Sequence, residues 1–309
     1  MRSTSRAEDG ARNGPRAGDA PGWGPEAIMR FKDILVQLDS SAQSASRLRL
    51  AADLARRHEA HLTGLLVVDV MTPMLMAGDG GGGAVLGDLL EEMRQDALAA
   101  AAKVEAGFRE TLRREGLAGE WRLVEGFAPS QVAMQARYAD LLILGQPDPE
   151  GALTNAAAVL EQALFASGRP VLVVPFAGDF VSIGQNILVG WNAGREAARA
   201  LADALPLLAA ARSVTVFSIN PAGGEDGHGE EPGADIALHL ARHGVRVSVE
   251  RTEARGIEPG DILLNQAADT MADLLVVGAY GHSRLREMVL GGVTRTLVRQ
   301  MTLPVLMAH

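Results

Sequence analysis

Cysteine is absent from the 309 residues of this sequence. Its absence excludes disulfide bonds, thiol catalysis and cysteine-ligated metal centres, and it is typical of proteins in the reducing cytoplasm. Long apolar runs are missing as well, because no stretch reaches the ~18 residues that a membrane-spanning helix needs. The sequence therefore predicts a cytoplasmic protein that does not cross a membrane.

Positive charge is scarce, with 29 Lys and Arg against 38 Asp and Glu, which leaves a net charge of −9. This balance argues against a nucleic-acid groove and against a general role at a membrane surface. It leaves room for a small anionic ligand, because backbone N–H groups hold phosphate without any charged side chain.

The length suits two domains of ordinary size, and the 47% of hydrophobic residues suits a globular protein. Residues 1–28 show no periodicity and are rich in Gly, Pro, Arg, Ala and Ser. They also lack the apolar core of a signal peptide. We predict a disordered tail over 1–28, a first domain over 29–176, a linker over 177–185 and a second domain over 186–309.

Three apolar blocks occur twice in the same order, which marks a duplicated domain. Each pair consists of a block in the first half and its counterpart in the second: DILVQLD (33–39) and NILVGWN (186–192), ADLLILG (139–145) and ADLLVVG (272–278), RPVLVVP (169–175) and LPVLMAH (303–309).

Strand-like and helix-like segments alternate within each copy, and several strands are apolar on both faces, as in a parallel sheet covered by helices. This pattern predicts two doubly wound α/β sandwiches of five parallel strands each, with the strand order 3-2-1-4-5. The predicted strands lie near 33–38, 61–69, 120–125, 140–145 and 170–174, then near 186–191, 213–219, 245–252, 273–277 and 304–308. The predicted helices lie near 44–59, 85–116, 129–138 and 153–167, then near 195–211, 233–243, 260–271 and 293–301.

Four glycines follow the fourth strand of the second copy, at Gly278, Gly281, Gly291 and Gly292. In an open α/β sheet, ligands bind beyond the carboxyl ends of the strands where the strand order reverses, which here lies between the first and fourth strands. Gly291 and Gly292 precede a helix whose first N–H groups lack intrahelical partners, so phosphate oxygens can fill those donors. The alternative interpretation is purely structural: the glycines only permit a tight strand–helix connection.

The spacing Gly278-x2-Gly281-x9-Gly291-Gly292-Val293-Thr294 resembles the ATP-binding signature of the universal stress protein family, G-x2-G-x9-G-(S/T). The resemblance covers about 33–175 and 186–309, so the chain looks like a tandem member of that family with two Rossmann-like domains of the adenine-nucleotide α-hydrolase type. It implies an adenine nucleotide (ATP, ADP or AMP), with Mg²⁺ left open, as a regulatory ligand rather than a substrate. The residues expected to hold it are Trp191, Asn192, Ser218, Val277, Gly278, Gly281, Gly291, Gly292, Val293 and Thr294.

Two positions of the second copy depart from the family pattern. Gly292 stands where the family has Ser or Thr, so one phosphate hydroxyl is absent, and Thr294 offers a substitute. Asn192 stands where binding members have Asp at the end of the first strand. An asparagine still hydrogen-bonds an adenine edge but carries no charge.

The first copy has Asp39 at that acid position but lacks the later glycines, and Pro147, Asp148, Pro149 and Glu150 follow Gly145 instead. We therefore predict that this copy does not bind ATP in the family's manner. Its expected role is that of an internal dimer partner, through pairing of the strands at 170–174 and 304–307. A further homodimer remains open.

Two other functions compete with nucleotide binding. A nucleotide-free scaffold for an unidentified protein partner is favoured by Gly292 and Asn192, and a slow ATP hydrolase ranks behind both.

No catalytic motif is present, so no catalytic residue is assigned. No metal site is assigned either: His239 and His243 have a metal-ligand spacing, but no third ligand is evident. The run GDGGGG (78–83) is interpreted as a loop rather than a dinucleotide fingerprint.

Overall fold

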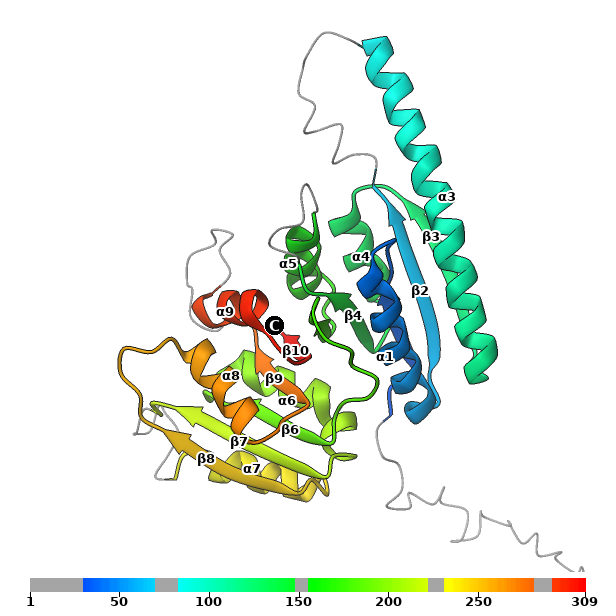
Figure 1. Ribbon diagram of the computed structural model, residues 1–309. Helices are drawn as coiled ribbons and strands as arrows, with labels where there is room; N and C mark the ends of the chain where they lie inside the picture. The colour runs from blue at the N-terminus through cyan, green and yellow to red at the C-terminus, as the bar shows by residue number, and fades with distance from the viewer. Residues whose placement is uncertain (1–29, 70–82, 148–154, 222–230, 281–290) are drawn as a thin grey trace, which may run out of the picture.

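A computed structural model describes residues 30–69, 83–147, 155–221, 231–280 and 291–309 (Figure 1). The predicted tail at 1–28, residues 78–82 of the glycine-rich run and Gly281 lie outside the described residues. Within the described parts of the chain, no helix combines the length and the apolar character needed to cross a bilayer.

The first half of the chain alternates five strands with four helices among its described residues, at bounds within a few residues of the predicted ones. In chain order these elements are β1 (Asp33–Gln37), α1 (Ala42–His58), β2 (His61–Val68), α3 (Gly83–Glu115), β3 (Gly119–Glu125), α4 (Ala128–Ala136), β4 (Leu141–Gly145), α5 (Ala156–Ala166) and β5 (Val171–Val174).

The second half repeats the same alternation. Its elements are β6 (Asn186–Gly190), α6 (Arg195–Leu208), β7 (Ser213–Ile219), α7 (Ala234–Arg242), β8 (Val247–Thr252), α8 (Pro259–Asp269), β9 (Leu274–Gly278), α9 (Gly292–Gln300) and β10 (Val305–Ala308).

The strands form one ten-stranded sheet in the order β3-β2-β1-β4-β5-β10-β9-β6-β7-β8. Each half is parallel and has the order 3-2-1-4-5, which confirms the predicted fold class and topology. The two parallel sheets are joined into one, because β5 of the first half and β10 of the second pair antiparallel, with Leu306 opposite Leu172. Both strands are buried along their whole length, and pairing satisfies backbone groups that would otherwise form an exposed sheet edge.

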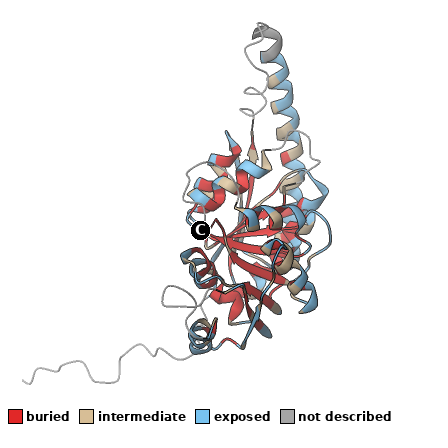
Figure 2. Cartoon of the chain, turned by 90° about the vertical axis from the view of Figure 1, so that its left-hand side faces the viewer, coloured by how far each residue is buried: buried red, intermediate tan, exposed pale blue. Residues whose placement is uncertain are grey.

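Helices cover both faces of the sheet, and the core lies between them and the strands (Figure 2). Side chains of α1, α3, α6 and α7 pack on one face, and those of α4, α5, α8 and α9 on the other. Each of the two larger core clusters contains residues from both halves of the chain. Hydrophobic burial therefore joins the two domains across the β5–β10 contact.

The aspartate of the repeated ADLL block has the same structural task in both halves. Asp140 accepts hydrogen bonds from the N–H groups of Lys32 and Asp33 at 2.7 and 3.1 Å, at the start of β1. Asp273 accepts three from the segment that enters β6: Gly184 and Gln185 at 2.9 Å, and Asn186 at 3.2 Å. These carboxylates fix the chain entering the first strand of each domain.

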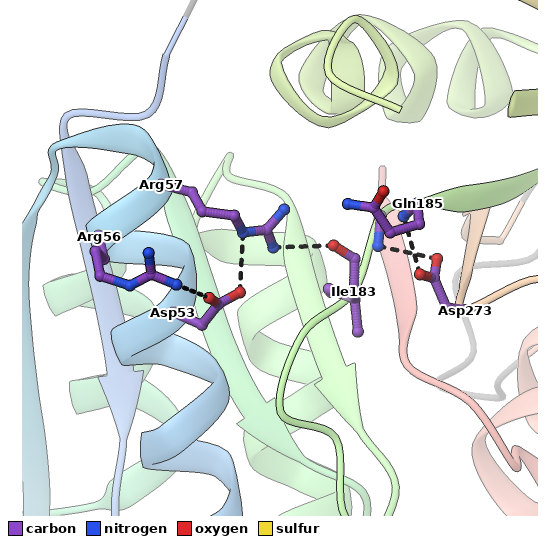
Figure 3. A network of polar contacts seen from close by, with 7 residues as sticks. Asp53, Arg56, Arg57, Ile183, Gln185 and Asp273 are labelled. Atoms are coloured by element: carbon purple, nitrogen blue, oxygen red, sulfur yellow. Dashed lines mark hydrogen bonds and ion pairs between the residues drawn. The ribbon is translucent and has the colours of Figure 1, made fainter. Parts of the chain in front are cut away.

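The connection between the two halves is held from both sides (Figure 3). On one side Arg57 of α1, ion-paired with Asp53 at 2.9 Å, donates a hydrogen bond to the Ile183 carbonyl at 2.9 Å. On the other side the Asp273 carboxylate binds the backbone of Gly184 and Gln185. The segment predicted as a linker is thus tied to both domains.

We expect Asp273→Ala to lower the free energy of unfolding by about 2–3 kcal/mol, because three N–H groups lose a charged acceptor. Urea denaturation followed by circular dichroism measures this change. Asp269→Ala is the matched control, since it removes the same charge from an exposed position on the neighbouring helix. Equal stability of the two variants would contradict the assigned role.

His58 makes the stability of the first domain depend on pH. Burial, followed by the charges of Arg57 and Arg30, lowers the pKa of His58 to about 4, and its ring packs on Phe31 with centroids 4.9 Å apart. The unfolded chain binds the proton near pH 6.5, whereas the folded chain resists it down to pH 4. The contribution of the neutral, buried His58 ring to the free energy of unfolding is therefore complete above pH 6.5 and is lost as the pH falls toward 4.

We expect the free energy of unfolding of the wild type to fall about 2 kcal/mol further than that of His58→Phe between pH 7 and pH 5. Denaturant titrations of both proteins at the two pH values measure the difference. Parallel losses in the two proteins would show that His58 does not carry this dependence.

Candidate functional site

A cavity of about 560 Å³ opens at the carboxyl ends of β6, β7 and β9 in the second half. β6 lies between β7 and β9, so this is the position where the strand order reverses. Eight of the ten predicted site residues line the cavity: Trp191, Asn192, Val277, Gly278, Gly291, Gly292, Val293 and Thr294.

The two remaining predicted residues are placed differently. Gly281 lies outside the described residues. Ser218 is fully buried, does not line the cavity, and its hydroxyl has no hydrogen-bond partner within the described ranges. Its neighbours Phe217 and Ile219 line the cavity instead, because successive residues of a strand point to opposite faces. The cavity thus lies beside the predicted strand β7, but on the face opposite to the Ser218 side chain.

Gly278 is required by packing. A Cβ atom at this position would lie 2.4 Å from the backbone nitrogen of Ala197 and 2.5 Å from the carbonyl carbon of Glu196. The first turn of α6 therefore rests directly on the end of β9. Packing against α6 therefore explains the glycine at 278, and it differs from the tight strand–helix connection considered as the alternative to a ligand site.

Gly291 and Gly292 differ from Gly278, because nothing described crowds them. A Cβ at Gly291 would be 3.9 Å from the Cα of Tyr280, and one at Gly292 would be 3.8 Å from Oε2 of Glu258, both ordinary contacts. Gly291 has φ −54° and ψ 152°, which any residue adopts. The described protein therefore has no steric or conformational need for glycine at 291 or 292, whereas a ligand approaching α9 would need that clearance.

The amino terminus of α9 faces this clearance. Gly291 is its N-cap residue and has no side chain with which to cap the helix, and the first intrahelical bond runs from the Arg295 N–H to the Gly291 carbonyl at 2.9 Å. Thr294 lies in the first turn, is 3% exposed, and lines the cavity. The uncapped N–H groups and the helix dipole form a site suited to an anion.

Asn192 holds its side chain in a local turn, because its Oδ1 accepts a hydrogen bond from the Gly194 N–H at 2.9 Å. The group it can present to the cavity is then the amide NH₂, which donates. Trp191 beside it lines the cavity and also packs against the core on the opposite face of the sheet. A ligand here meets a donor where an aspartate would supply an acceptor.

Tyr280 lines the cavity and was missed by sequence reasoning, since it occupies an unspecified position of the glycine pattern. Its φ is +70°, an uncommon backbone conformation for a residue with a bulky side chain. The side chain is buried, and its hydroxyl has no hydrogen-bond partner among the described residues. Burial, and to a lesser extent the charge of Glu161, raises the pKa of this hydroxyl.

The equivalent position in the first half is occupied by the chain itself. Arg47 of α1 is buried and forms an ion pair with Asp39 at 2.7 Å, and its Nε donates to the Gln37 carbonyl at 2.7 Å. A Cβ at Gly145 would lie 2.0 Å from Nη1 of Arg47, so the guanidinium reaches the end of β4. The other oxygen of Asp39 accepts the Ser41 N–H at 2.8 Å.

Burial raises the pKa of Asp39 and the adjacent Arg47 lowers it, with a net value below the ordinary one. The carboxylate is therefore charged and already bound on both oxygens. The cavity at the carboxyl ends of β1, β2 and β4, the position equivalent to the candidate site, measures about 360 Å³. Among the described residues of the whole chain, no three His, Asp or Glu side chains gather closely enough to hold a metal ion.

Comparison with known families matches this chain twice. The model of the universal stress protein family matches residues 30–175 and 184–309. The chain belongs to the universal stress protein family. It carries two universal stress protein domains in tandem, as the repeated blocks predicted, and no curated protein matches it.

Two solved structures that match most of this tandem universal stress protein support the fold, and a third is similar to part of it. A universal stress protein from Archaeoglobus fulgidus DSM 4304 has a TM-score of 0.65 at 18% identity, covering 89% of this chain and 95% of that chain. A protein of unknown function from Pseudomonas aeruginosa PAO1 has a TM-score of 0.52 at 18% identity, covering 91% and 94%. A universal stress protein in complex with cAMP is 18% identical over 48% of this chain and 98% of that chain, with a TM-score of 0.33.

Proposed function

We propose that the second domain of this universal stress protein binds an adenine nucleotide such as ATP, ADP or AMP. The observation that carries the proposal is the uncapped amino terminus of α9, which faces a 560 Å³ cavity across two glycines that the described fold does not need. Phosphate groups would accept hydrogen bonds from the first N–H groups of α9, and Thr294 would add a hydroxyl.

The rest of the cavity suits a base and a ribose. Apolar side chains of Phe217, Ile219, Leu263 and Val277 line it, and a flat heterocycle is well accommodated between such groups. Asn192 would hydrogen-bond a base edge through its amide NH₂. The same cavity thus combines an apolar wall with the hydrogen-bond donors at the amino terminus of α9.

In this proposal the first domain does not bind nucleotide. Its switch point is filled by the Arg47 guanidinium, and the carboxylate at the family's acid position is bound to Arg47 and to Ser41. A ligand that displaced Asp39 would leave the buried Arg47 guanidinium without its partner, which is costly. Only the second domain would then respond to nucleotide.

We further propose a regulatory ligand rather than a substrate. The described lining of the second cavity contains no Asp, Glu, His, Lys or Arg. Phosphoryl transfer needs an acid that holds a metal ion and a group that positions the nucleophile. A nucleotide bound here would act by favouring one conformation or one protein partner.

Isothermal titration calorimetry of the full chain with ATP, ADP and AMP, with and without Mg²⁺, tests the proposal. Saturable binding of at least one nucleotide at about one site per chain is expected. Absence of heat and of any melting shift with all three would overturn nucleotide binding and favour the scaffold function suggested by Gly292 and Asn192. Phosphate release above that of Gly291→Val would instead establish the hydrolase.

A further inference from the structure

The first domain contacts the candidate site of the second through an aromatic cluster of Phe165, Tyr280 and His309. Phe165 belongs to α5 of the first domain, and its ring centroid lies 4.2 Å from that of Tyr280 and 4.8 Å from that of His309. Figure 1 shows α5 beside β10 and α9, at the junction of the two halves. His309 in turn contacts the Ala279 carbonyl through Nδ1 at 3.1 Å.

Tyr280 connects this cluster to the cavity. Its Cα is the nearest described atom to the position of a Cβ on Gly291, at 3.9 Å, so its main chain sets the gap in front of α9. Its side chain extends toward α5, where it meets Phe165 and the charge of Glu161. The ring is therefore held by the first domain while the backbone borders the ligand site.

The backbone of Tyr280 needs such support. A left-handed conformation is unfavourable for a tyrosine and persists only where the surrounding structure imposes it. The hydroxyl is buried without a partner in the described structure, so hydrogen bonding does not anchor this side chain. Packing holds it instead: its ring lies 4.2 Å from that of Phe165 and 5.9 Å from that of His309, centroid to centroid, and Phe165 is the nearer of the two.

A second contact between the domains reaches α9 itself. Gln146, which follows β4 and is buried, donates a hydrogen bond from Nε2 to the Val298 carbonyl of α9 at 2.8 Å. Its Oε1 accepts the Phe176 N–H at 3.0 Å. The first domain thus contacts the exit of β9, which borders the gap, and the last turn of α9, whose first turn borders the gap from the other side.

We propose that Phe165 and Gln146 of the first domain are positioning residues for the nucleotide site of the second domain. The proposal rests on the proposed function for its ligand. The domain that has lost its own site would be retained because it holds Tyr280 and α9 at the separation that admits phosphate. Positioning would act through Tyr280, with no contact between Phe165 and the nucleotide.

Calorimetry of Phe165→Ala in the full chain tests this role. We expect the Kd for the nucleotide that binds the wild type to rise about five- to tenfold. Phe165→Leu, which retains apolar bulk, should recover part of the loss. Tyr138→Ala is the matched control, because it removes an aromatic ring of the first domain that is 74% exposed. All titrations are performed well below the lowest melting temperature of the set, so that a purely structural loss leaves the Kd unchanged.

Hydrogen exchange without nucleotide provides a readout that does not depend on the proposed function. Phe165→Ala should exchange faster than the wild type at Ala279, whose N–H binds the Ala308 carbonyl at 2.8 Å, and at Arg295 in α9. Wild-type exchange at both positions would overturn the proposal, as would an unchanged Kd with a lowered melting temperature. If the wild type binds no nucleotide, the proposed function fails while exchange still decides whether Phe165 positions the gap.

Discussion

Gly291→Val is expected to raise the Kd for nucleotide at least ~100-fold while the melting temperature stays within about 2 °C of the wild type. The space beside Gly291 is open, its nearest described neighbour being the Cα of Tyr280 at 3.9 Å from an added Cβ. Its backbone conformation is one that valine adopts readily. The branched side chain would therefore fit the free protein and fill the clearance in front of α9.

Calorimetry measures the loss of binding, and differential scanning calorimetry measures the stability of the same samples. Gly107→Val serves as the control, because Gly107 is an exposed glycine of α3 in the first domain with nothing within 4 Å of an added Cβ. Gly291→Val that binds like the wild type would show that phosphate does not approach α9. Such a result would remove the nucleotide cradle from this protein.

Gly278→Ala is expected to destabilise the fold by roughly 3 kcal/mol and to lower the melting temperature by roughly 5–10 °C. The added Cβ would overlap the backbone of Glu196 and Ala197, at 2.5 and 2.4 Å, and a backbone cannot move aside as a flexible side chain does. The first turn of α6 would have to separate from the end of β9. β9, which borders the cavity, would then lose its support from α6.

Gly291→Ala is the matched comparison for Gly278→Ala, since both variants add the same methyl group to glycines of the same motif. Thermal and chemical denaturation should separate them clearly, with Gly291→Ala close to the wild type. Equal stability of the two alanine variants would show that the α6–β9 contact is looser than the structure indicates. The pair therefore distinguishes a glycine needed for packing from a glycine needed for a ligand.

Much of this protein follows from its sequence by itself. The repeated blocks at 33–39 and 186–192, together with the other two pairs, revealed the duplication, and apolar patterning revealed the alternation of strands and helices. The strand order expected for such a doubly wound sheet is the one that each half has. Runs such as Leu274–Val277 are apolar on both faces, and only a parallel sheet between two helical layers buries both. Local periodicity and burial are short-range properties, so a single sequence is sufficient to reveal them.

The candidate site was predictable where it depends on the backbone and unpredictable where it depends on side-chain direction. The topology placed the ends of β6 and β9 together, and eight predicted residues line the cavity there. Phe217 and Ser218 are adjacent on β7, so their side chains point to opposite faces of the sheet, and only Phe217 faces the cavity. The two adjacent positions are not distinguished by a pattern in which both are buried.

Only the tertiary structure decided the contacts between distant parts of the chain. No local pattern relates the Arg47 guanidinium to Gly145, or the Phe165 ring to Tyr280, although they are in contact. No local pattern distinguishes Gly278, which packs against α6, from Gly291, which has open space beside it. The pairing of β5 with β10 into a single sheet was anticipated as a contact, and the structure established its register. Such contacts depend on which surfaces meet after folding, and that is settled by packing in three dimensions rather than by the order of residues along the chain.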